Sequence, residues 1–277
     1  MNCKFCQSPN TIKYGYRSET HYYKCKDCGR KFSGKMAPEN MHFSKKIINE
    51  SIDLFYYGIP LRDISRHILI SEKTYVDPSS IWRWILRFSR KAEQILNNVN
   101  IGHSQRWIVC ENKIKNGSRT WLIIDVLDFT TRFLLASLVT ANRSLEQIKE
   151  LFLIAHSRTN NTPIQVVTNR YAVYSEVVEQ VFGANTEHIK HIKGKGIRSD
   201  IDTHIIRLFQ RTTQGRTDIL GRLRTPESVK VIAQGYTFYY NFMCPLKELG
   251  NLTPSMKVGL NDIFDNWIKV MDHYLEV

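Results

Sequence analysis

Residues 106–138, RWIVCENKIKNGSRTWLIIDVLDFTTRFLLASL, decide the fold of this chain. Within this stretch the apolar residues follow the two-residue period of β-strands at Trp107–Cys110, Thr120–Val126 and Thr131–Leu138. The connections between these runs are short, which is typical of neighbouring antiparallel strands. We therefore expect three consecutive antiparallel strands.

The residues after this stretch alternate between helical and strand patterns. A helix is predicted over Ser144–Ala155, a fourth strand over Ile164–Thr168 and a further helix over about Ala172–Phe182. Residues 193–230 form a basic, mostly helical stretch, and a long aromatic helix is predicted over Val229–Met243. Three strands followed by alternating helices and a strand predict a mixed α/β domain.

A helical segment is predicted before this domain, at residues 43–98. One helix covers Leu61–Ile68, and the next begins near Asp77-Pro78. This layout is typical of a helix-turn-helix, whose second helix enters the major groove of DNA. A generic three-helix bundle with a solvated basic face is the alternative. The residues predicted to pack inward are Ile81, Trp82 and Ile85, and those predicted to face DNA are Ser79, Ser80, Arg83 and Arg87.

Four cysteines near the N-terminus have the spacing of a zinc site. Cys3-x2-Cys6 and Cys25-x2-Cys28 are two pairs separated by 18 residues. Each pair directs two thiolates at one point, and two pairs supply the four tetrahedral ligands of a structural zinc ion. The sequence therefore predicts a zinc ribbon at residues 1–37, with free or redox-active cysteines as the alternative.

The charge balance predicts a polyanionic partner. The 277 residues include 39 Lys and Arg against 26 Asp and Glu, which gives a net charge of +13. The apolar runs are shorter than the roughly 18–20 residues that cross a bilayer, so no membrane span is expected. The N-terminus lacks the pattern of a secretory signal, and we expect an intracellular, cytoplasmic protein in a reducing compartment.

Several stretches together resemble a known family. They are Leu61–Ser65, Thr131–Ser137, Gly235-Tyr236, Tyr239–Phe242 and Leu252–Pro254. In these stretches the chain resembles insertion-sequence DDE transposases of the IS-six type, especially archaeal members. The resemblance implies an RNase H-like, retroviral integrase-like mixed sheet flanked by helices at residues 105–277, behind the zinc ribbon and the helix-turn-helix. It also implies double-stranded DNA as partner and a homodimer that bridges two DNA ends.

The resemblance also identifies the positions of three metal-binding carboxylates, and these differ here. In this family the carboxylates hold two divalent ions that drive phosphodiester cleavage and strand transfer. Cys110, in Val109–Asn112, occupies the first Asp position, and Asn169, in Thr168–Arg170, occupies the second. The third position falls at Arg207, within His204–Arg207, or in a second register at Asp202.

Such replacements remove the ligands that Mg²⁺ requires. A thiol is a poor Mg²⁺ ligand, asparagine offers only a neutral carbonyl oxygen, and arginine is a permanent cation. Magnesium is therefore not expected. Glu111 follows Cys110 directly and should face away from the former site, because adjacent strand residues point to opposite faces. The other candidate ligands are interpreted as strand-end or turn acids (Asp125, Asp128), loop or cap residues (Asp200, Asp202) and solvated or phosphate-facing histidines (His188, His191, His204).

The function expected is that of a DNA-binding protein derived from a DDE transposase. It is expected to be catalytically inactive, nucleoid-associated and active in chromatin organisation or transcription regulation. Two alternatives are an active insertion-sequence transposase with relocated metal ligands, which carries out DNA cleavage and strand transfer in transposition, and a decayed product without function. The side chains expected to contact DNA are Arg62, Ser79, Ser80, Arg83, Arg87, Arg170, Lys193, Lys195, Arg198, Arg207, Arg211 and Arg216.

Overall fold

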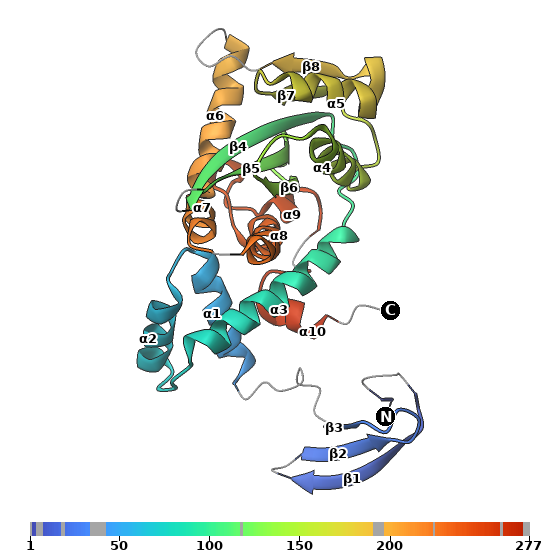
Figure 1. The fold of residues 1–277 in the computed structure, drawn as a ribbon, viewed down its shortest axis with the longest axis vertical. Coiled ribbons are helices and arrows are strands. Elements are labelled where there is room, and N and C mark those ends of the chain that lie inside the picture. The colour runs from blue at the N-terminus through green and yellow to red at the C-terminus, as the bar shows by residue number, and fades with distance from the viewer. Residues whose placement is uncertain are drawn as a thin grey trace. The chain divides into compact units, whose positions relative to one another are not determined.

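The structure is a computed structural model, and it divides the chain into two compact units, residues 1–44 and 45–277 (Figure 1). Each unit has its own core. The residues that the structure describes are 2–3, 8–17, 20–33, 43–116, 119–190, 197–223, 225–260 and 263–273. In this part of the chain no helix is both long and apolar enough to cross a membrane.

The first unit is a small antiparallel sheet. Its strands β1 (Thr11–Arg17), β2 (Thr20–Cys25) and β3 (Lys31–Ser33) pair in the order β1-β2-β3. Its core contains the buried residues Cys3, Cys25 and Phe32, with Tyr23 packed against them. So small a core contributes little stability by itself, because short modules bury too little apolar surface.

A five-stranded mixed sheet forms the centre of the second unit. Its strand order is β6-β5-β4-β7-β8, in which β4, β5 and β6 are antiparallel and β7 and β8 run parallel to β4. The three antiparallel strands and the RNase H-like fold class predicted from the sequence are confirmed. The strands are β4 (Arg106–Asn116), β5 (Arg119–Asp128), β6 (Leu134–Thr140), β7 (Gln165–Thr168) and β8 (Glu187–Lys190).

Two strand predictions differ from the structure. The third strand starts at Leu134 rather than Thr131, because the Asp128 carboxylate accepts hydrogen bonds from the backbone N–H groups of Thr130 (3.1 Å) and Thr131 (2.7 Å). These bonds close a turn, and Arg132 within it has a φ of 61°. The edge strand β8 was not predicted, because it has only four residues and none of them is buried.

Helices cover both faces of this sheet. On one face, Trp107 of β4 stacks on Phe152 of α4 (Leu145–Ser157) and meets Phe182 of α5 (Ala172–Phe182) edge to face. The opposite face carries α7 (Gln214–Gly221) and α8 (Pro226–Met243), with α6 (Ile197–Thr212) beside β4 (Figure 1). The predicted aromatic helix is α8, and its rings fill the core. The short helices α9 (Pro254–Lys257) and α10 (Trp267–Asp272) follow it.

The helical segment at residues 43–98 packs against α8 within the same unit. It consists of α1 (Lys45–Tyr56), α2 (Leu61–Ser71) and α3 (Pro78–Asn97). The carboxylate of Asp77 caps α3 by accepting a 2.8 Å hydrogen bond from the Ser79 N–H. Contact with α8 is close, because a Cβ added at Gly235 would lie 2.0 Å from the Tyr56 hydroxyl and 2.5 Å from Ser89 Oγ. The absence of a side chain at Gly235 therefore permits this helix packing.

Candidate functional site

Strand β4 carries two adjacent side chains with opposite surroundings. Cys110 is buried and pairs across the sheet with Asp125, on the face that α7 and α8 cover. Glu111 points to the other face, where α5 supplies a neighbour, Tyr174. The alternation of strand side chains thus separates the two residues into two different environments.

Beside Cys110 lies a buried ion pair. The Arg216 guanidinium donates to both carboxylate oxygens of Asp125, with 3.0 Å between Nη1 and Oδ1, and both side chains are fully buried. Ser137 Oγ adds a third hydrogen bond to this carboxylate at 2.6 Å. Burial by itself would lower the pKa of Arg216, but the Asp125 charge outweighs it and raises the pKa above its ordinary value. The ion pair therefore favours the charged form of Arg216.

This arrangement corrects one expected DNA contact. Arg216 was predicted to touch DNA, but its guanidinium has no access to solvent and is held by Asp125. The pKa of the Cys110 thiol is raised well above its ordinary value. Burial is the main cause, and the nearby Asp125 charge is the second. Cys110 is accordingly a neutral core residue.

On the opposite face, Glu111 is held by three neighbours. Arg143 donates two hydrogen bonds to its carboxylate at 2.9 and 2.6 Å, the Tyr174 hydroxyl donates another, and the Asn169 side chain also contacts it. Arg143 in turn lies over the Tyr171 ring, 3.7 Å from its centre. Burial would raise the pKa of Glu111, but the bonds from Arg143, Tyr174 and Asn169 outweigh burial and lower it. Glu111 therefore stays ionised.

The predicted opposite orientation of Glu111 and Cys110 agrees with the structure, but Asn169 lies on the Glu111 side. Glu111 and Cys110 do point to opposite faces, yet Asn169 contacts Glu111 rather than Cys110. The reason is that Asn169 follows the last residue of β7, where the chain turns toward α5. Cys110 and Asn169, the two positions predicted to have replaced carboxylates, consequently lie on different sides of the sheet.

Both candidates for the predicted third position, Arg207 and Asp202, lie on α6. Arg207 is exposed there, whereas Asp202 is only 2% exposed and accepts bonds of 2.8 and 2.9 Å from Arg106 at the start of β4. Asp202 was predicted to be a loop or cap residue, and this is corrected: it lies inside the helix and faces the sheet. Asp200 also lies in α6, but its side chain is outside the described residues.

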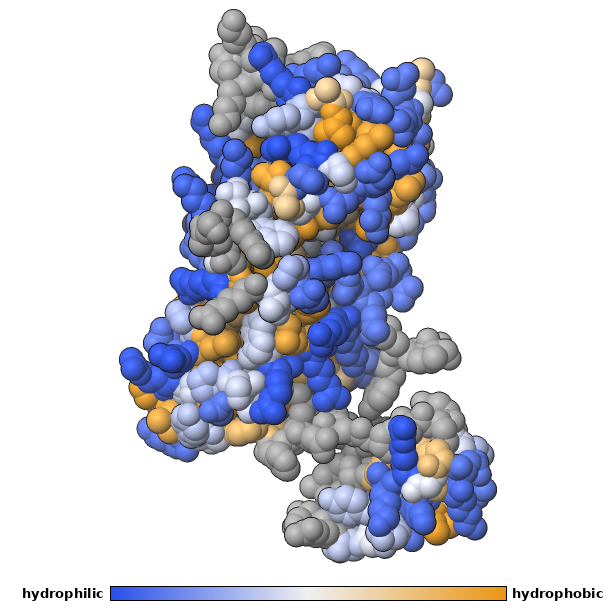
Figure 2. All heavy atoms as spheres, in the orientation of Figure 1, coloured by the Kyte–Doolittle hydropathy of each residue, from blue (hydrophilic) through white to orange (hydrophobic). Residues whose placement is uncertain are grey.

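The remaining predicted contact residues differ in exposure. Ser80 is half-buried, Arg198 lies in α6 with its side chain outside the described residues, and Lys193 and Lys195 lie outside them altogether. Figure 2 shows hydrophilic side chains over most of the face in view. The predicted contact residues that are exposed are Arg62, Ser79, Arg83, Arg87, Arg170, Arg207 and Arg211.

Two predictions about the exposure of side chains need correction, those for Trp82 and His188. Ile81 and Ile85 are buried as expected, but Trp82 is half-buried and lies beside Phe55, with Trp84 taking the inward position. His188 is also half-buried, and its Nε2 lies 2.8 Å from the Thr168 hydroxyl, rather than being solvated. Burial lowers the pKa of His188. His204 is exposed, and His191 lies outside the described residues.

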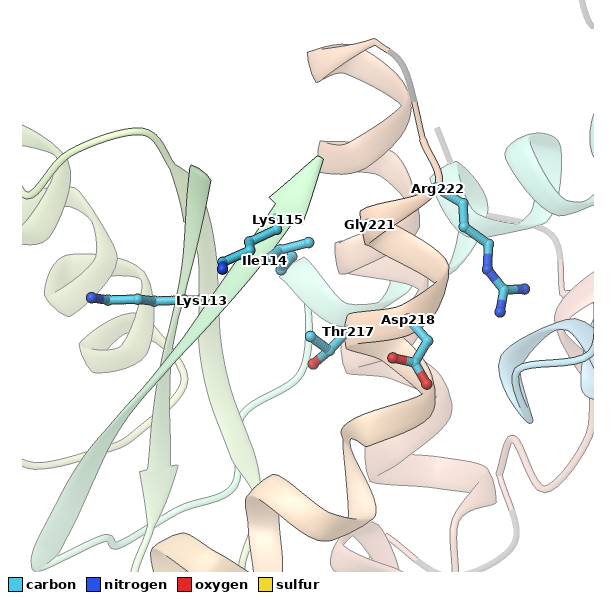
Figure 3. A pocket seen from close by; sticks show the side chains of 7 residues that line it. All are labelled: Lys113, Ile114, Lys115, Thr217, Asp218, Gly221 and Arg222. Atoms are coloured by element: carbon cyan, nitrogen blue, oxygen red, sulfur yellow. The ribbon is translucent and has the colours of Figure 1, made fainter. Parts of the chain in front are cut away.

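A pocket of 270 Å³ lies between the C-terminal half of β4 and α7 (Figure 3). A Cβ added at Gly221 would lie 3.3 Å from the Ile114 side chain, so the strand and helix are in close contact at the pocket. Figure 3 shows Lys113 and Arg222 pointing away from each other. The basic side chains therefore do not converge on one anion. The lining residues are Lys113, Ile114, Lys115, Thr217, Asp218, Gly221 and Arg222.

Three of the predicted zinc ligands meet in the first unit. The sulfurs of Cys3, Cys25 and Cys28 all lie within 4.8 Å of one another, with 3.6 Å between Cys3 and Cys28. A tetrahedral ion with zinc–sulfur bonds of about 2.3 Å places its sulfurs about 3.8 Å apart, so the cluster fits a metal such as zinc. The turn after Cys25 contains Gly29 at a φ of 72°. Cys6 lies outside the described residues.

Known proteins are similar to parts of this chain. A family model described as a DDE domain matches residues 104–243. The chain is similar to the HTLV-2 integrase catalytic core domain, solved in a complex with magnesium, at 10% identity and a TM-score of 0.40, over 57% of this chain and 97% of that one. A chain of the simian T-cell lymphotropic virus intasome is similar at 9% identity and a TM-score of 0.42, over 76% and 74% of the two chains. No curated protein matches this sequence.

Proposed function

The chain belongs to the DDE domain family of transposases, and from this premise we propose that it is a DNA-binding protein whose nuclease centre has been dismantled. In this proposal it acts as a chromatin-associated or transcription-regulating factor on the nucleoid in the cytoplasm, as a homodimer on double-stranded DNA. In this proposal the chain has lost cleavage activity and has kept DNA binding.

One observation supports the proposed loss of catalysis. Three carboxylates line strand β4, and each is held by an arginine: the pairs are Glu111–Arg143, Asp125–Arg216 and Asp202–Arg106. A divalent metal needs free anionic oxygen ligands, and here it would have to displace a guanidinium from each carboxylate. Removing a guanidinium partner from such a buried pair is costly, because it leaves an uncompensated charge. These carboxylates therefore do not replace the lost metal ligands.

The residues at the replaced positions also support the proposed loss of catalysis. Cys110 is a buried neutral thiol, Asn169 offers an amide, and Arg207 is an exposed cation. Relative to three carboxylates, these residues remove the negative charge that concentrates two dications. We propose that Mg²⁺ has no site in this chain.

Retained DNA binding is supported by charge and by the helical segment. The chain carries a net charge of +13, and Arg62, Arg83 and Arg87 are exposed on α2 and α3. Phosphate contacts from such side chains hold DNA whether or not it is cut. We propose that Ser79, Ser80, Arg83 and Arg87 contact DNA from α3.

The first unit is proposed to bind one structural zinc ion. Its ligands would be Cys3, Cys6, Cys25 and Cys28, of which three already meet in the structure. A bound zinc ion supplies folding free energy to a unit whose core is too small to supply it. The ion has no catalytic part in this proposal.

The experiment that tests the proposal combines binding with cleavage. The purified full chain should bind a labelled duplex with an affinity that falls steeply as salt rises, and it should leave a supercoiled plasmid uncut in Mg²⁺ or Mn²⁺. Matched variants are Arg83→Ala on α3 and Lys149→Ala, an exposed residue of α4. Only Arg83→Ala should reduce the salt slope, by about 0.9 per lost phosphate contact.

Plasmid cleavage that disappears in Glu111→Gln or Asp125→Asn would support the alternative, an active transposase with relocated ligands. A map of the chain's positions on DNA in its own cells would separate the biological roles. Occupancy across promoters or broad domains would support a regulator or chromatin protein. Occupancy confined to terminal inverted repeats would contradict that role and tie the chain to mobile elements.

A further inference from the structure

The sheet of the first unit has two unlike faces. Strand side chains alternate, so Tyr23 and Cys25 of β2 point to the face that packs on Phe32 and Cys3. Tyr22 and Lys24 point to the opposite face, and Lys24 stands beside Ile12 of β1 and Lys31 of β3 in the strand register. We call this opposite side the outer face. It is formed by Ile12, Tyr14, Tyr22, Lys24 and Lys31.

Tyr14 belongs to the outer face although the pairing of β1 is irregular at this point. The register shifts between Lys13 and Gly15, which leaves Tyr14 in a bulge. The Lys31 ammonium reaches across the sheet, donates to the Tyr14 hydroxyl and lies 4.0 Å from its ring centre. Lys31 is the main cause, ahead of Lys24, of a lowered pKa at Tyr14. Tyr14, Lys24 and Lys31 thus lie on one side of the sheet.

The aromatic side chains of the outer face are open to solvent. Tyr14 is 53% exposed, Tyr22 is 37% exposed and Ile12 is 43% exposed. Three neighbouring exposed apolar or aromatic side chains on one side of a small sheet are typical of an interaction site. Neither tyrosine contributes to the core around Phe32.

The charged side chains of the first unit are almost all positive in its described residues, and Lys24 and Lys31 lie on the outer face itself. Residues 8–17 and 20–33 contain six Lys and Arg and one acidic residue, Asp27. Asp27 accepts hydrogen bonds from Ser8 and from the Asn10 side-chain amide (3.0 Å), at the turn near the cysteines. The partner of the outer face should therefore be an anion that also offers flat apolar surfaces.

We propose that the outer face binds single-stranded nucleic acid, with unpaired bases stacked on Tyr14 and Tyr22 and the backbone phosphates near Lys24 and Lys31. Every base has a π face, and exposed aromatic rings beside lysines on a sheet provide a stacking platform for it. A duplex hides these base faces inside its own stack. The inference goes beyond the proposed function, because duplex binding by α3 does not use this face.

The test uses the full chain with its zinc and labelled single strands. Oligothymidylate and oligouridylate of about 20 nucleotides, longer than the roughly 4–16 nucleotides of a typical site, separate DNA from RNA as the source of the bases. Fluorescence anisotropy should show binding to at least one of them. Tyr14→Leu and Tyr22→Leu together should weaken it at least about tenfold, because stacking on an aromatic ring contributes about 1–3 kcal/mol per base. Phenylalanine at both positions should preserve binding.

The matched control is Tyr16→Leu. Tyr16 is 64% exposed in the same strand, but it lies against His21 on the other face, with ring centres 4.7 Å apart. The Tyr16→Leu variant should bind both oligonucleotides as tightly as the unaltered chain does. Lys31→Ala should lower the salt slope by about 0.7. Equal zinc content in all variants establishes that the first unit is folded in each of them. If the Tyr22→Leu variant loses zinc, the test is made with Tyr14→Leu and Lys31→Ala alone.

The outcomes separate this inference from the proposed function. Duplex binding without single-strand binding would overturn the inference and leave the proposed function standing. Single-strand binding without duplex binding would do the reverse. Leucine variants that bind as tightly as the unaltered chain, or a Tyr16→Leu variant that loses as much, would also overturn it. Binding to anionic lipid vesicles in place of both strands would assign the face to a membrane surface instead.

Discussion

Arg216 of α7 and Asp125 of β5 form a fully buried ion pair beside Cys110, the residue that pairs with Asp125 across the sheet. The rings of Phe209 and Tyr236 lie near the guanidinium, 5.8 and 5.2 Å from its carbon. In this environment neither charge can be solvated by water, so each depends on the other. The pair ties a helix on one face of the sheet to the central strands.

Removing one partner of this pair should destabilise the protein. Asp125→Ala should lower the free energy of unfolding by about 3–5 kcal/mol, because it leaves the Arg216 charge buried and uncompensated. Asp125→Leu combined with Arg216→Met should recover much of this loss. Urea denaturation of the single and double variants measures both effects, and Arg211→Ala, at an exposed position, should change little.

If the double variant is no more stable than either single variant, the two side chains are not coupled and the ion pair does not explain their burial.

Glu111 should contribute to the pH dependence of stability. Its pKa in the folded chain is lowered, whereas the unfolded value is about 4.3. Its stabilising contribution is therefore present above about pH 4.3 and is lost as the pH falls through the folded pKa. The stability difference between the unaltered chain and Glu111→Gln should be largest near neutral pH and shrink in acid, as urea midpoints across pH would show.

The matched variant is Arg143→Ala. It removes the first partner of Glu111 but leaves the carboxyl buried, so the pKa of Glu111 should rise, as carboxyl resonances in NMR titration would show. An unchanged Glu111 pKa in this variant would contradict the role given to Arg143.

Metal removal should affect the two compact units differently. A chelator should unfold the first unit, because its core contains little besides Cys3, Cys25 and Phe32. Residues 45–273 should keep their structure, since their core is separate. Residue-resolved NMR spectra before and after chelation would show which signals collapse. Loss of signals from both units, or from neither, would contradict a structural metal confined to the first unit.

Gly235→Ala should disturb the packing of α8 on the helical segment. The new methyl group would lie 2.0 Å from the Tyr56 hydroxyl, so the helices must separate or Tyr56 must move. We expect a loss of about 1–3 kcal/mol of stability, measured by thermal or urea unfolding. Tyr56→Phe combined with Ser89→Ala removes both clashing oxygens and should restore part of it. An alanine variant of unaltered stability would mean that α8 does not approach α1 and α3 this closely.

The parts of the fold that follow local patterns were predictable from the sequence. The two-residue period of residues 106–138 predicted three antiparallel strands, and the cysteine spacing predicted the cluster of the first unit, in which three of its cysteines meet. The short edge strand Glu187–Lys190 was missed, because an exposed four-residue strand has no periodicity to read.

The surroundings of the candidate site were not predictable in the same way. The chain separation between bonded partners is 32 residues for Glu111 and Arg143, 91 for Asp125 and Arg216 and 96 for Arg106 and Asp202. No local pattern links positions so far apart. Arg216, which was predicted to contact DNA, and Arg106 and Arg143, for which no role was predicted, could be assigned to carboxylates only after the helices were placed on the sheet.

By itself the sequence, through its family resemblance, predicted that Cys110 and Asn169 occupy two metal-ligand positions, and their ligand chemistry depends only on residue type. Tertiary structure alone decided what became of the remaining carboxylates. Their fate depends on which charge lies within hydrogen-bonding distance in a water-excluded interior, where an unpaired charge costs several kcal/mol. In the folded chain that charge is an arginine at Glu111, at Asp125 and at Asp202.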